Sequence, residues 1–265
     1  MSLWDSIKNF FKHFTFGSKK TKPEVPVQEQ PPVVVPPVVS PEIPSEGTLP
    51  FRLIGKDKIQ GIDVYHYDGI KSFQEIAEEQ DFIIFKVSEG ASHEDTKYKE
   101  WIPKARAAGL IVGYYHFFRT NVDPIKQAQS FLSKVKPFLK EGDLCVVCDY
   151  ETEDDKADGF DIFEVALFLE TVESSLNWIP WVYSGHILKQ AGKEYTVPKE
   201  MARYPLWIAH YTNKSAPTVP APWAKETLWQ YTETAMLKGM SNPKGTDHNR
   251  FNGTGKDFDA LRYRK

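Results

Sequence analysis

The sequence predicts an α/β fold: an irregular (β/α) barrel preceded by a short amphipathic helix and a proline-rich linker. Three observations support this prediction. Short apolar runs rich in β-branched and aromatic residues alternate with helix-like segments over residues 51–265. The spacing between these runs shortens toward the C-terminus. Eight of the 19 prolines fall between positions 23 and 44, where they prevent a packed element.

Seven apolar runs in residues 51–265 have the composition of buried strands, and helical periodicity separates the early ones. Gly109 and Gly142 are expected to close the second and third helices. After Trp207 the spacing between strand centres falls to about 20 residues, which is short for a crossover helix, so the last third is expected to be irregular and partly antiparallel. The predicted strands are 61–65, 82–87, 111–115, 144–147, 181–183, 206–209 and 228–231, and the helices are 72–79, 97–108, 124–139 and 160–176.

Composition excludes several classes of protein. The 265 residues carry a net charge of −3, which argues against a general nucleic-acid binder. No window approaches about eighteen consecutive apolar residues, so no membrane-spanning helix is predicted. Two cysteines are too few for a disulfide framework. Aromatic residues make up 14% of the chain, which suits a surface that stacks on flat ligands.

Residues 1–20 are predicted to form a basic amphipathic helix. Apolar residues recur at positions 3, 4, 7, 10, 11 and 14, on one helical face, and residues 1–22 carry a net charge of +4. Such a helix suits an anionic membrane surface, bound through residues 1–16, or a docking partner. Polar interruptions argue against a Sec-type signal peptide, so synthesis in the cytoplasm is expected.

Residues 21–50 are predicted to form a linker. Proline removes amide donors and pushes the preceding residue toward extended conformations, so a semi-rigid spacer is expected. A proline-rich ligand for a partner's aromatic groove is the alternative.

Asp149 and Glu151 are the sharpest candidates for chemistry, because they directly follow the buried run 144–148. Side chains alternate along a strand, so both carboxyl groups face one way, with Cα atoms about 6.6 Å apart, and Tyr150 faces the other. Two carboxylates on one face oppose each other's ionisation, so one can hold the proton that glycoside cleavage needs. A calcium site or a helix-capping cluster is the alternative, since four more acidic residues lie between positions 153 and 158.

Cys145 and Cys148 form a C-x-x-C pattern on the same predicted strand. Positions i and i+3 point to opposite faces, so the pair is expected neither to form a disulfide nor to share a metal. Both are interpreted as packing residues, with Cys145 on the Asp149 face. The histidines at 66, 116, 210 and 248 show no H-x-H or H-E-x-x-H spacing that would indicate a metal site.

Other acidic and aromatic residues stand at matching strand ends. Asp63 lies inside an apolar run, where burial of an unpaired acid is costly. Glu89 follows the second run, Tyr115 ends the third, and Asp247 lies near the end of the chain. Taken alone, each of these residues is more simply interpreted as having a structural role. Barrel active sites lie at the carboxyl ends of strands, however, so these groups are expected to converge on one face.

Eight motifs occur in a fixed order between residues 58 and 254. They are GIDV (61–64), KVSEG (86–90), GYYHF (113–117), DYE (149–151), YSG (183–185), LWIA (206–209), WQY (229–231) and DHN (247–249). Together they resemble the lysozymes of glycoside hydrolase family 25, which are N-acetylmuramidases. The resemblance implies a barrel of five βα units and three further strands. It also implies cleavage of the β-1,4 bond between N-acetylmuramic acid and N-acetylglucosamine in peptidoglycan, with no metal or other cofactor.

The resemblance assigns roles residue by residue. Glu151 matches the general acid/base, and Asp149 matches the partner that steadies the substrate's 2-acetamido group, which can itself act as nucleophile. Asp63 and Asp247 match two further acidic residues of the groove. The expected substrate-binding residues are Tyr115, Tyr183, Trp207, Gln230 and Glu89. The sequence departs from the family pattern at Tyr65, where Ser is frequent, and at His210, where Gln is frequent, and both bear on the shape of the sugar subsites.

Three classes of function follow from these observations. The leading one is a monomeric muramidase of the phage-endolysin type that acts on peptidoglycan glycan strands, in the periplasm or outside the cell. A non-catalytic glycan-binding barrel and a membrane- or partner-tethered scaffold are the alternatives. Both are disfavoured because all four acidic positions are filled.

Overall fold

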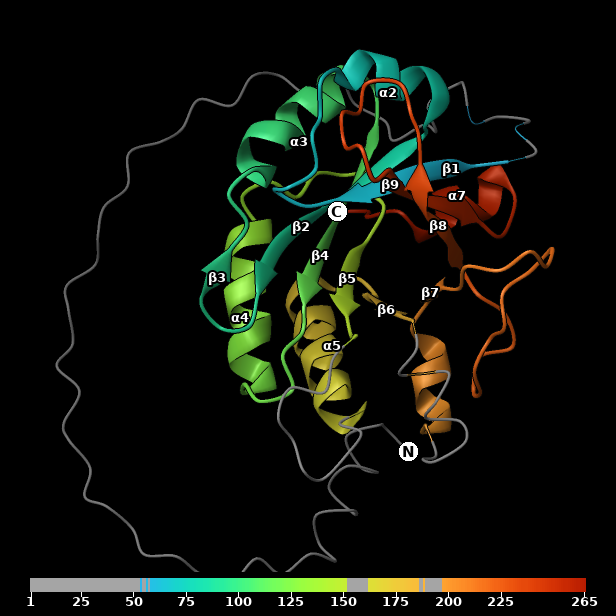
Figure 1. The fold of residues 1–265 in the computed structure, drawn as a ribbon. Coiled ribbons are helices and arrows are strands. Elements are labelled where there is room, and N and C mark those ends of the chain that lie inside the picture. Colours follow the sequence, from blue (N-terminus) through green and yellow to red (C-terminus); the bar gives the residue numbers. More distant parts are fainter. Residues whose placement is uncertain (1–52, 54–55, 57, 152–161, 186–187, 189–196) are drawn as a thin grey trace, which may run out of the picture. The chain divides into compact units, whose positions relative to one another are not determined.

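The computed structural model describes residues 53, 56, 58–151, 162–185, 188 and 197–265 (Figure 1). The predicted N-terminal helix (1–20) and proline-rich linker (21–50) lie outside the described residues. Within the described part, no helix is long and apolar enough to cross a membrane.

Eight strands close into a barrel. The first strand, β1 (Gln60–Val64), pairs with both β2 (Phe82–Glu89) and the last strand, β9 (Thr246–Phe251), so the ring has no open edge. Around the ring the order is β1-β9-β8-β7-β6-β5-β4-β2 (Figure 1). The short β3 (His93–Glu94) pairs with the end of β2. The other strands are β4 (Ile111–Phe117), β5 (Val146–Asp149), β6 (Trp181–Ser184), β7 (Leu206–Ala209) and β8 (Leu228–Ala235).

Strand directions confirm the irregular barrel. Every neighbouring pair from β1–β2 round to β7–β8 is parallel. The pairs β8–β9 and β9–β1 are antiparallel. The connection from β7 to β8 is described throughout and contains no helix, although these strands are still parallel. Around the closed ring, antiparallel pairing therefore begins only with β9, while the short β3 outside the ring also pairs antiparallel with β2.

The helices begin where the sequence carries start signals. Ser72 caps the first, with its hydroxyl accepting a hydrogen bond from the Glu75 backbone N–H, and Asp123 caps the third, with Pro124 in its first turn. The connection from β6 to β7 runs partly through residues outside the description. The described helices are α2 (Phe73–Glu79), α3 (Tyr98–Ala107), α4 (Pro124–Val135), α5 (Ile162–Leu176), the 3₁₀-helix η2 (Lys199–Arg203) and α7 (Gly255–Leu261).

Of the two glycines expected to close helices, only Gly109 does so. It follows α3 with a φ of +85°, a conformation that favours glycine. The prediction for Gly142 was wrong, because α4 ends at Val135 rather than at 139. Gly142 instead lies in the turn before β5 with a φ of +88°, where a Cβ atom would lie 2.5 Å from Nη2 of Arg262.

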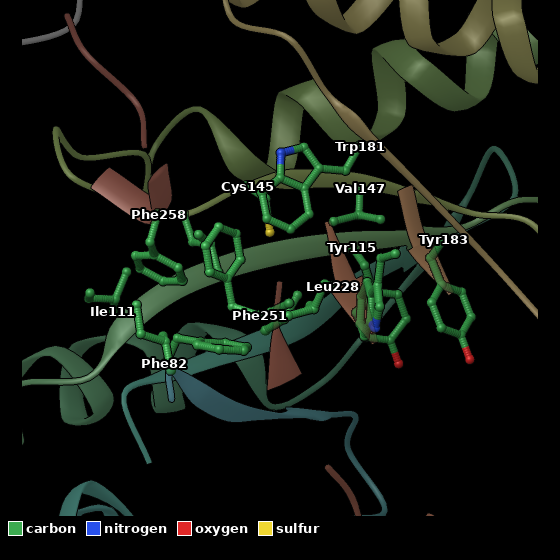
Figure 2. Close-up of a cluster of buried hydrophobic side chains, with 14 of the residues drawn as sticks. Phe82, Ile111, Tyr115, Cys145, Val147, Trp181, Tyr183, Leu228, Phe251 and Phe258 are labelled. Carbon is green, nitrogen blue, oxygen red and sulfur yellow. The ribbon is translucent and has the colours of Figure 1, made fainter. Parts of the chain in front are cut away.

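The barrel interior is filled by one cluster of buried side chains (Figure 2). Phe82 on β2 and Cys145 with Val147 at β5 belong to it, as alternation along a strand requires. The alternate face of the same strands packs outward, where Phe85 meets Trp101 of α3 at 6.4 Å between ring centroids. Cys145 and Cys148 are both buried free thiols, as predicted.

Candidate active site

A pocket of about 270 Å³ lies at the carboxyl ends of the parallel strands, and all four predicted acidic residues line it. Asp149 ends β5, and Glu151 follows two residues later. Asp63 lies on β1, directly opposite Asp247 of β9. Because β9 is antiparallel to β1, its amino end reaches the same edge of the barrel. The fold thus gathers acids that lie up to 184 positions apart in the chain.

Four of the five predicted substrate-binding residues also line the pocket: Tyr115, Tyr183, Trp207 and Gln230. Glu89 does not. Its carboxylate accepts hydrogen bonds from Lys86 Nζ at 2.7 Å and from Arg119 Nε at 2.9 Å. Burial opposes ionisation of Glu89, but these two cations outweigh it and lower its pKa to about 2. The structure therefore places Glu89 behind Lys86, in an ion-pair network beside the pocket.

Several pocket residues were not predicted. Lys86 shares the inward face of β2 with Phe82 and Ile84, so alternation along this strand is a signal that could have identified it. Tyr211 follows β7 in the sequence, without a comparable pattern. The remaining unpredicted lining residues are Phe117 and Glu233, and Tyr65, which was expected to bear on the shape of the sugar subsites, lines the pocket as well.

A hydrogen-bond network holds the Asp63 side of the pocket. Gln230 Nε2 donates to both carboxylate oxygens of Asp63, at 3.2 and 3.1 Å, and Asn249 Nδ2 donates to Oδ2 at 2.6 Å. The Oε1 atom of Gln230 accepts from the hydroxyls of Tyr183 and Tyr211, at 2.9 and 2.8 Å. Trp207 Nε1 donates to Oδ1 of Asn249 at 2.8 Å. The network fixes the amide orientations and links the pocket aromatics to Asp63.

Asp149 differs from Asp63 in its partners. Its side chain is buried, and its Oδ1 atom has no hydrogen-bond partner among the described residues. Burial raises the pKa of Asp149 well above its usual range, and the nearby Glu151 raises it further. An unpaired buried carboxyl oxygen is costly in the free protein, so a substrate donor is the natural group to satisfy it.

Glu151 is the more exposed member of the pair. Burial of its carboxyl group raises its pKa, and the neighbouring Tyr183 opposes this rise. A glutamic acid whose pKa is raised and which lines a pocket has the properties of a general acid.

The pKa values of the two remaining acids are raised as well. Burial raises the pKa of Asp63 to about 7, against the hydrogen bonds from Asn249 and Gln230. Burial and then the neighbouring Asp63 raise the pKa of Asp247 to about 9. Burial and the closeness of the carboxyl groups thus raise the pKa of all four acids in the pocket.

The described part of the chain offers no ligand group of the kind that a metal ion needs. No group of three or more His, Cys, Asp and Glu side chains there is arranged to hold a metal ion. His116 is buried against Phe168 at 5.0 Å, and its Nδ1 lies 2.8 Å from the hydroxyl of Ser88. Burial lowers its pKa to about 3, so it is a neutral packing residue.

A barrel with paired carboxyl groups at its strand ends is typical of glycoside hydrolases, and the family match below shows that class. The sequence model of glycosyl hydrolases family 25 matches residues 62–240, and the chain belongs to this family. Together with its lysozyme relatives, this family match shows that the chain is a glycoside hydrolase of the lysozyme or muramidase type.

Known relatives share both sequence and fold with this chain. The uncharacterized protein YegX of Escherichia coli K12 is 29% identical over 218 residues, which cover 80% of this chain and 76% of YegX. Lysozyme M1 of Streptomyces globisporus is 28% identical and covers 77% of this chain and 71% of its own length. The lysozyme of Streptomyces coelicolor, whose crystal structure is known, is 28% identical in sequence to this chain. It superposes with a TM-score of 0.67 over 77% of this chain and 96% of that one.

Proposed function

We propose that this chain cleaves the β-1,4 bond between N-acetylmuramic acid and N-acetylglucosamine in peptidoglycan, with Glu151 as general acid/base and Asp149 as the assisting residue. One observation carries the proposal: two carboxyl groups from the end of β5 share a pocket, one buried and partly unpartnered and the other more exposed. Membership of family 25 and the likeness to Lysozyme M1 support this substrate class.

The proposed reaction begins with protonated Glu151, which donates its proton to the glycosidic oxygen as the bond to the muramic acid C1 breaks. The carbonyl oxygen of the 2-acetamido group attacks C1, and Asp149 Oδ1 accepts the acetamido N–H and stabilises the developing positive charge. Ionised Glu151 then takes a proton from water, which attacks C1 and reopens the ring formed by the acetamido group. Each carboxyl group returns to its starting state.

The other pocket residues have binding roles in this proposal. Tyr115 and Trp207 present aromatic surface to the apolar face of a sugar ring. Asp63, held by Gln230 and Asn249, offers an acceptor to sugar hydroxyl or amide donors. These contacts would orient the strand so that the scissile oxygen reaches Glu151.

Glu151→Gln tests the central assignment. The amide keeps the size of the side chain but carries no titratable proton, so turnover of purified peptidoglycan should fall by at least about 10²-fold. Glu141→Gln is the matched control, because Glu141 is an exposed glutamate in the turn before β5 and should leave turnover unchanged. Near-normal turnover by a folded Glu151→Gln protein would contradict the assignment.

Product analysis tests the bond that is cut. After borohydride reduction, mass spectrometry should find reduced muramic acid at the new ends. Reduced glucosamine ends would contradict the muramidase assignment, and the absence of any product would favour the non-catalytic glycan-binding alternative.

We also propose the cell wall as the place of action, with residues 1–16 binding an anionic membrane surface. This part of the proposal depends on sequence alone, on the apolar helical face and the net charge of +4 over residues 1–22. Anionic vesicles should induce helicity and shift Trp4 fluorescence to the blue, and salt should weaken the effect. Unchanged spectra would favour a protein partner instead.

A further inference from the structure

A second pocket, of about 430 Å³, lies beside the catalytic pocket. The two pockets share Tyr65, Glu233 and Asp247, so a ligand seated in one can continue into the other. The other residues lining this second pocket are Asp68, Thr234, Asn242, Lys244, Gly245 and Thr246.

Specific hydrogen bonds build the walls of the second pocket. Asp68, in the loop after β1, accepts from the Tyr65 backbone N–H at 2.9 Å and from Asn242 Nδ2 at 3.3 Å. The Ser241 backbone N–H donates to the carbonyl oxygen of Gly69 at 2.7 Å. These contacts join the β1 loop to the connection between β8 and β9, and so connect the two walls of the pocket.

Two groups in the second pocket lack partners within the described part of the chain. The hydroxyl of Thr246 is buried and makes no hydrogen bond, and Thr246 as a whole is 2% exposed. A buried hydroxyl without a partner destabilises the free protein. The side chain of Lys244 is exposed at the same pocket and forms no ion pair with a described residue. Lys244 is exposed to a ligand, and the Thr246 hydroxyl is a buried group for which no described residue supplies a partner.

The two pockets differ in what they can bind. Aromatic side chains contribute six residues to the lining of the catalytic pocket but only Tyr65 to that of the second pocket. Aromatic faces favour a neutral sugar, whereas Lys244, Asp68 and Glu233 offer charges of both signs, which form strong hydrogen bonds with charged and amide groups. The second pocket therefore suits a charged, amide-rich ligand better than more glycan.

We propose that the second pocket binds the stem peptide attached to the lactyl group of the muramic acid residue being cleaved. This inference rests on the proposed muramidase function. Lys244 pairs with a free carboxylate of the peptide, Asp68 and Glu233 accept its amide N–H groups, and the Thr246 hydroxyl bonds to a peptide amide. The enzyme thereby distinguishes peptide-bearing strands from bare ones.

The test compares two substrates prepared from the same glycan strands, one with its stem peptides and one stripped of them by an amidase. The wild-type protein should have a kcat/KM about tenfold higher on peptide-bearing strands. Lys244→Ala should lower this ratio by about fivefold, mainly through KM, and Lys244→Glu should lower it further. Thr246→Val keeps the side-chain shape and should also lower the ratio, without lowering the melting temperature, since no hydrogen bond is lost within the described protein.

Lys238→Ala is the matched control. It removes the same charge from the same β8–β9 connection, but Lys238 does not line the second pocket, so the ratio should stay at the wild-type value. Equal wild-type turnover of both strands, or an unchanged ratio in Lys244→Glu, would overturn the peptide site alone. Loss of turnover on both strands to the same degree in the Lys244 variants would also overturn it. Failure of the wild-type protein to cleave either strand would overturn the proposed function itself.

Discussion

Two buried aspartates near the two ends of β5 show how one residue type can serve structure or chemistry. Asp143, before the strand, accepts hydrogen bonds from Arg106 Nη2 at 2.8 Å, from the Tyr114 hydroxyl at 2.7 Å and from the Lys140 backbone N–H at 2.8 Å. Asp149, at the carboxyl end, keeps Oδ1 buried without a partner among the described residues. Burial raises the pKa of both carboxyl groups, and only at Asp143 does a directly bonded arginine oppose it.

Asp143 has a fully hydrogen-bonded carboxylate, whereas Asp149 keeps one carboxyl oxygen that a substrate can bind. At Asp143 every part of the carboxylate is engaged, so the group ties the turn before β5 to α3 and β4. At Asp149 the free oxygen carries an energetic penalty that a substrate donor can relieve. Depth of burial and a raised pKa are common to both, so the supply of partners is what distinguishes them.

The largest expected effect is on stability, from Asp143→Ala. Removal of the carboxylate leaves the Arg106 guanidinium partly buried and unpaired, which should lower the free energy of unfolding by about 3–5 kcal/mol. Chemical denaturation measures this change. Glu141→Ala, an exposed neighbour, should change it by no more than about 0.5 kcal/mol. Similar losses in both variants would remove the distinction between the two regions.

Asp149→Asn is expected to impair turnover rather than stability. Turnover of peptidoglycan should fall by at least about 10²-fold, because an amide cannot stabilise the developing positive charge. The melting temperature should not fall, because the substitution removes a buried acid that is incompletely paired. A folded and fully active Asp149→Asn protein would make Asp149 a structural neighbour like Asp143.

A further effect concerns pH. Asp63 and Asp247 have folded pKa values of about 7 and about 9, against 3.8 as the ordinary value. The folded protein therefore holds two protons that the unfolded chain releases near pH 4. Their stabilising contribution is complete below about pH 4 and declines as the pH rises, until it is lost above about pH 9.

Melting temperatures measured between pH 4 and pH 9 test this trend. Asp247→Asn should flatten the decline, and Asp63→Asn should flatten its part below about pH 7. A wild-type melting temperature that rises steadily over this range, with both variants parallel to it, would show that the pocket acids are ionised in the folded state.

The smallest effect is expected at the cysteines. Cys145→Ala and Cys148→Ala should each lower the free energy of unfolding by about 1 kcal/mol through lost packing. Dithiothreitol should change neither the melting temperature nor turnover, since both thiols are buried and unpaired. A loss of activity on reduction would contradict the opposite-face placement.

Alternation and motif order are enough to predict the centre of the site. From Cys145 to Glu151 the side chains alternate between two faces, so the shared face of Asp149 and Glu151 follows from the backbone alone. The convergence of Asp63, Tyr183 and Trp207 follows as well, because the carboxyl ends of parallel strands meet at one edge of a barrel. Local patterns suffice wherever the strand period decides which way a residue points.

Tertiary structure decided what depends on partners distant in the chain. A register shift between Lys86 and Ser88 changes the phase at the end of β2, and Arg119 from beyond β4 binds Glu89, which removes that carboxylate from the pocket lining. The hydrogen bond from Asn249 Nδ2 to Asp63 joins residues 186 positions apart in the chain. The sequence by itself determined the barrel and the carboxyl pair, because both follow from local periodicity. Only the tertiary structure decided which acids accept hydrogen bonds from other residues and which keep an oxygen without a partner. The donors come from distant segments, and no local pattern encodes a contact between such segments.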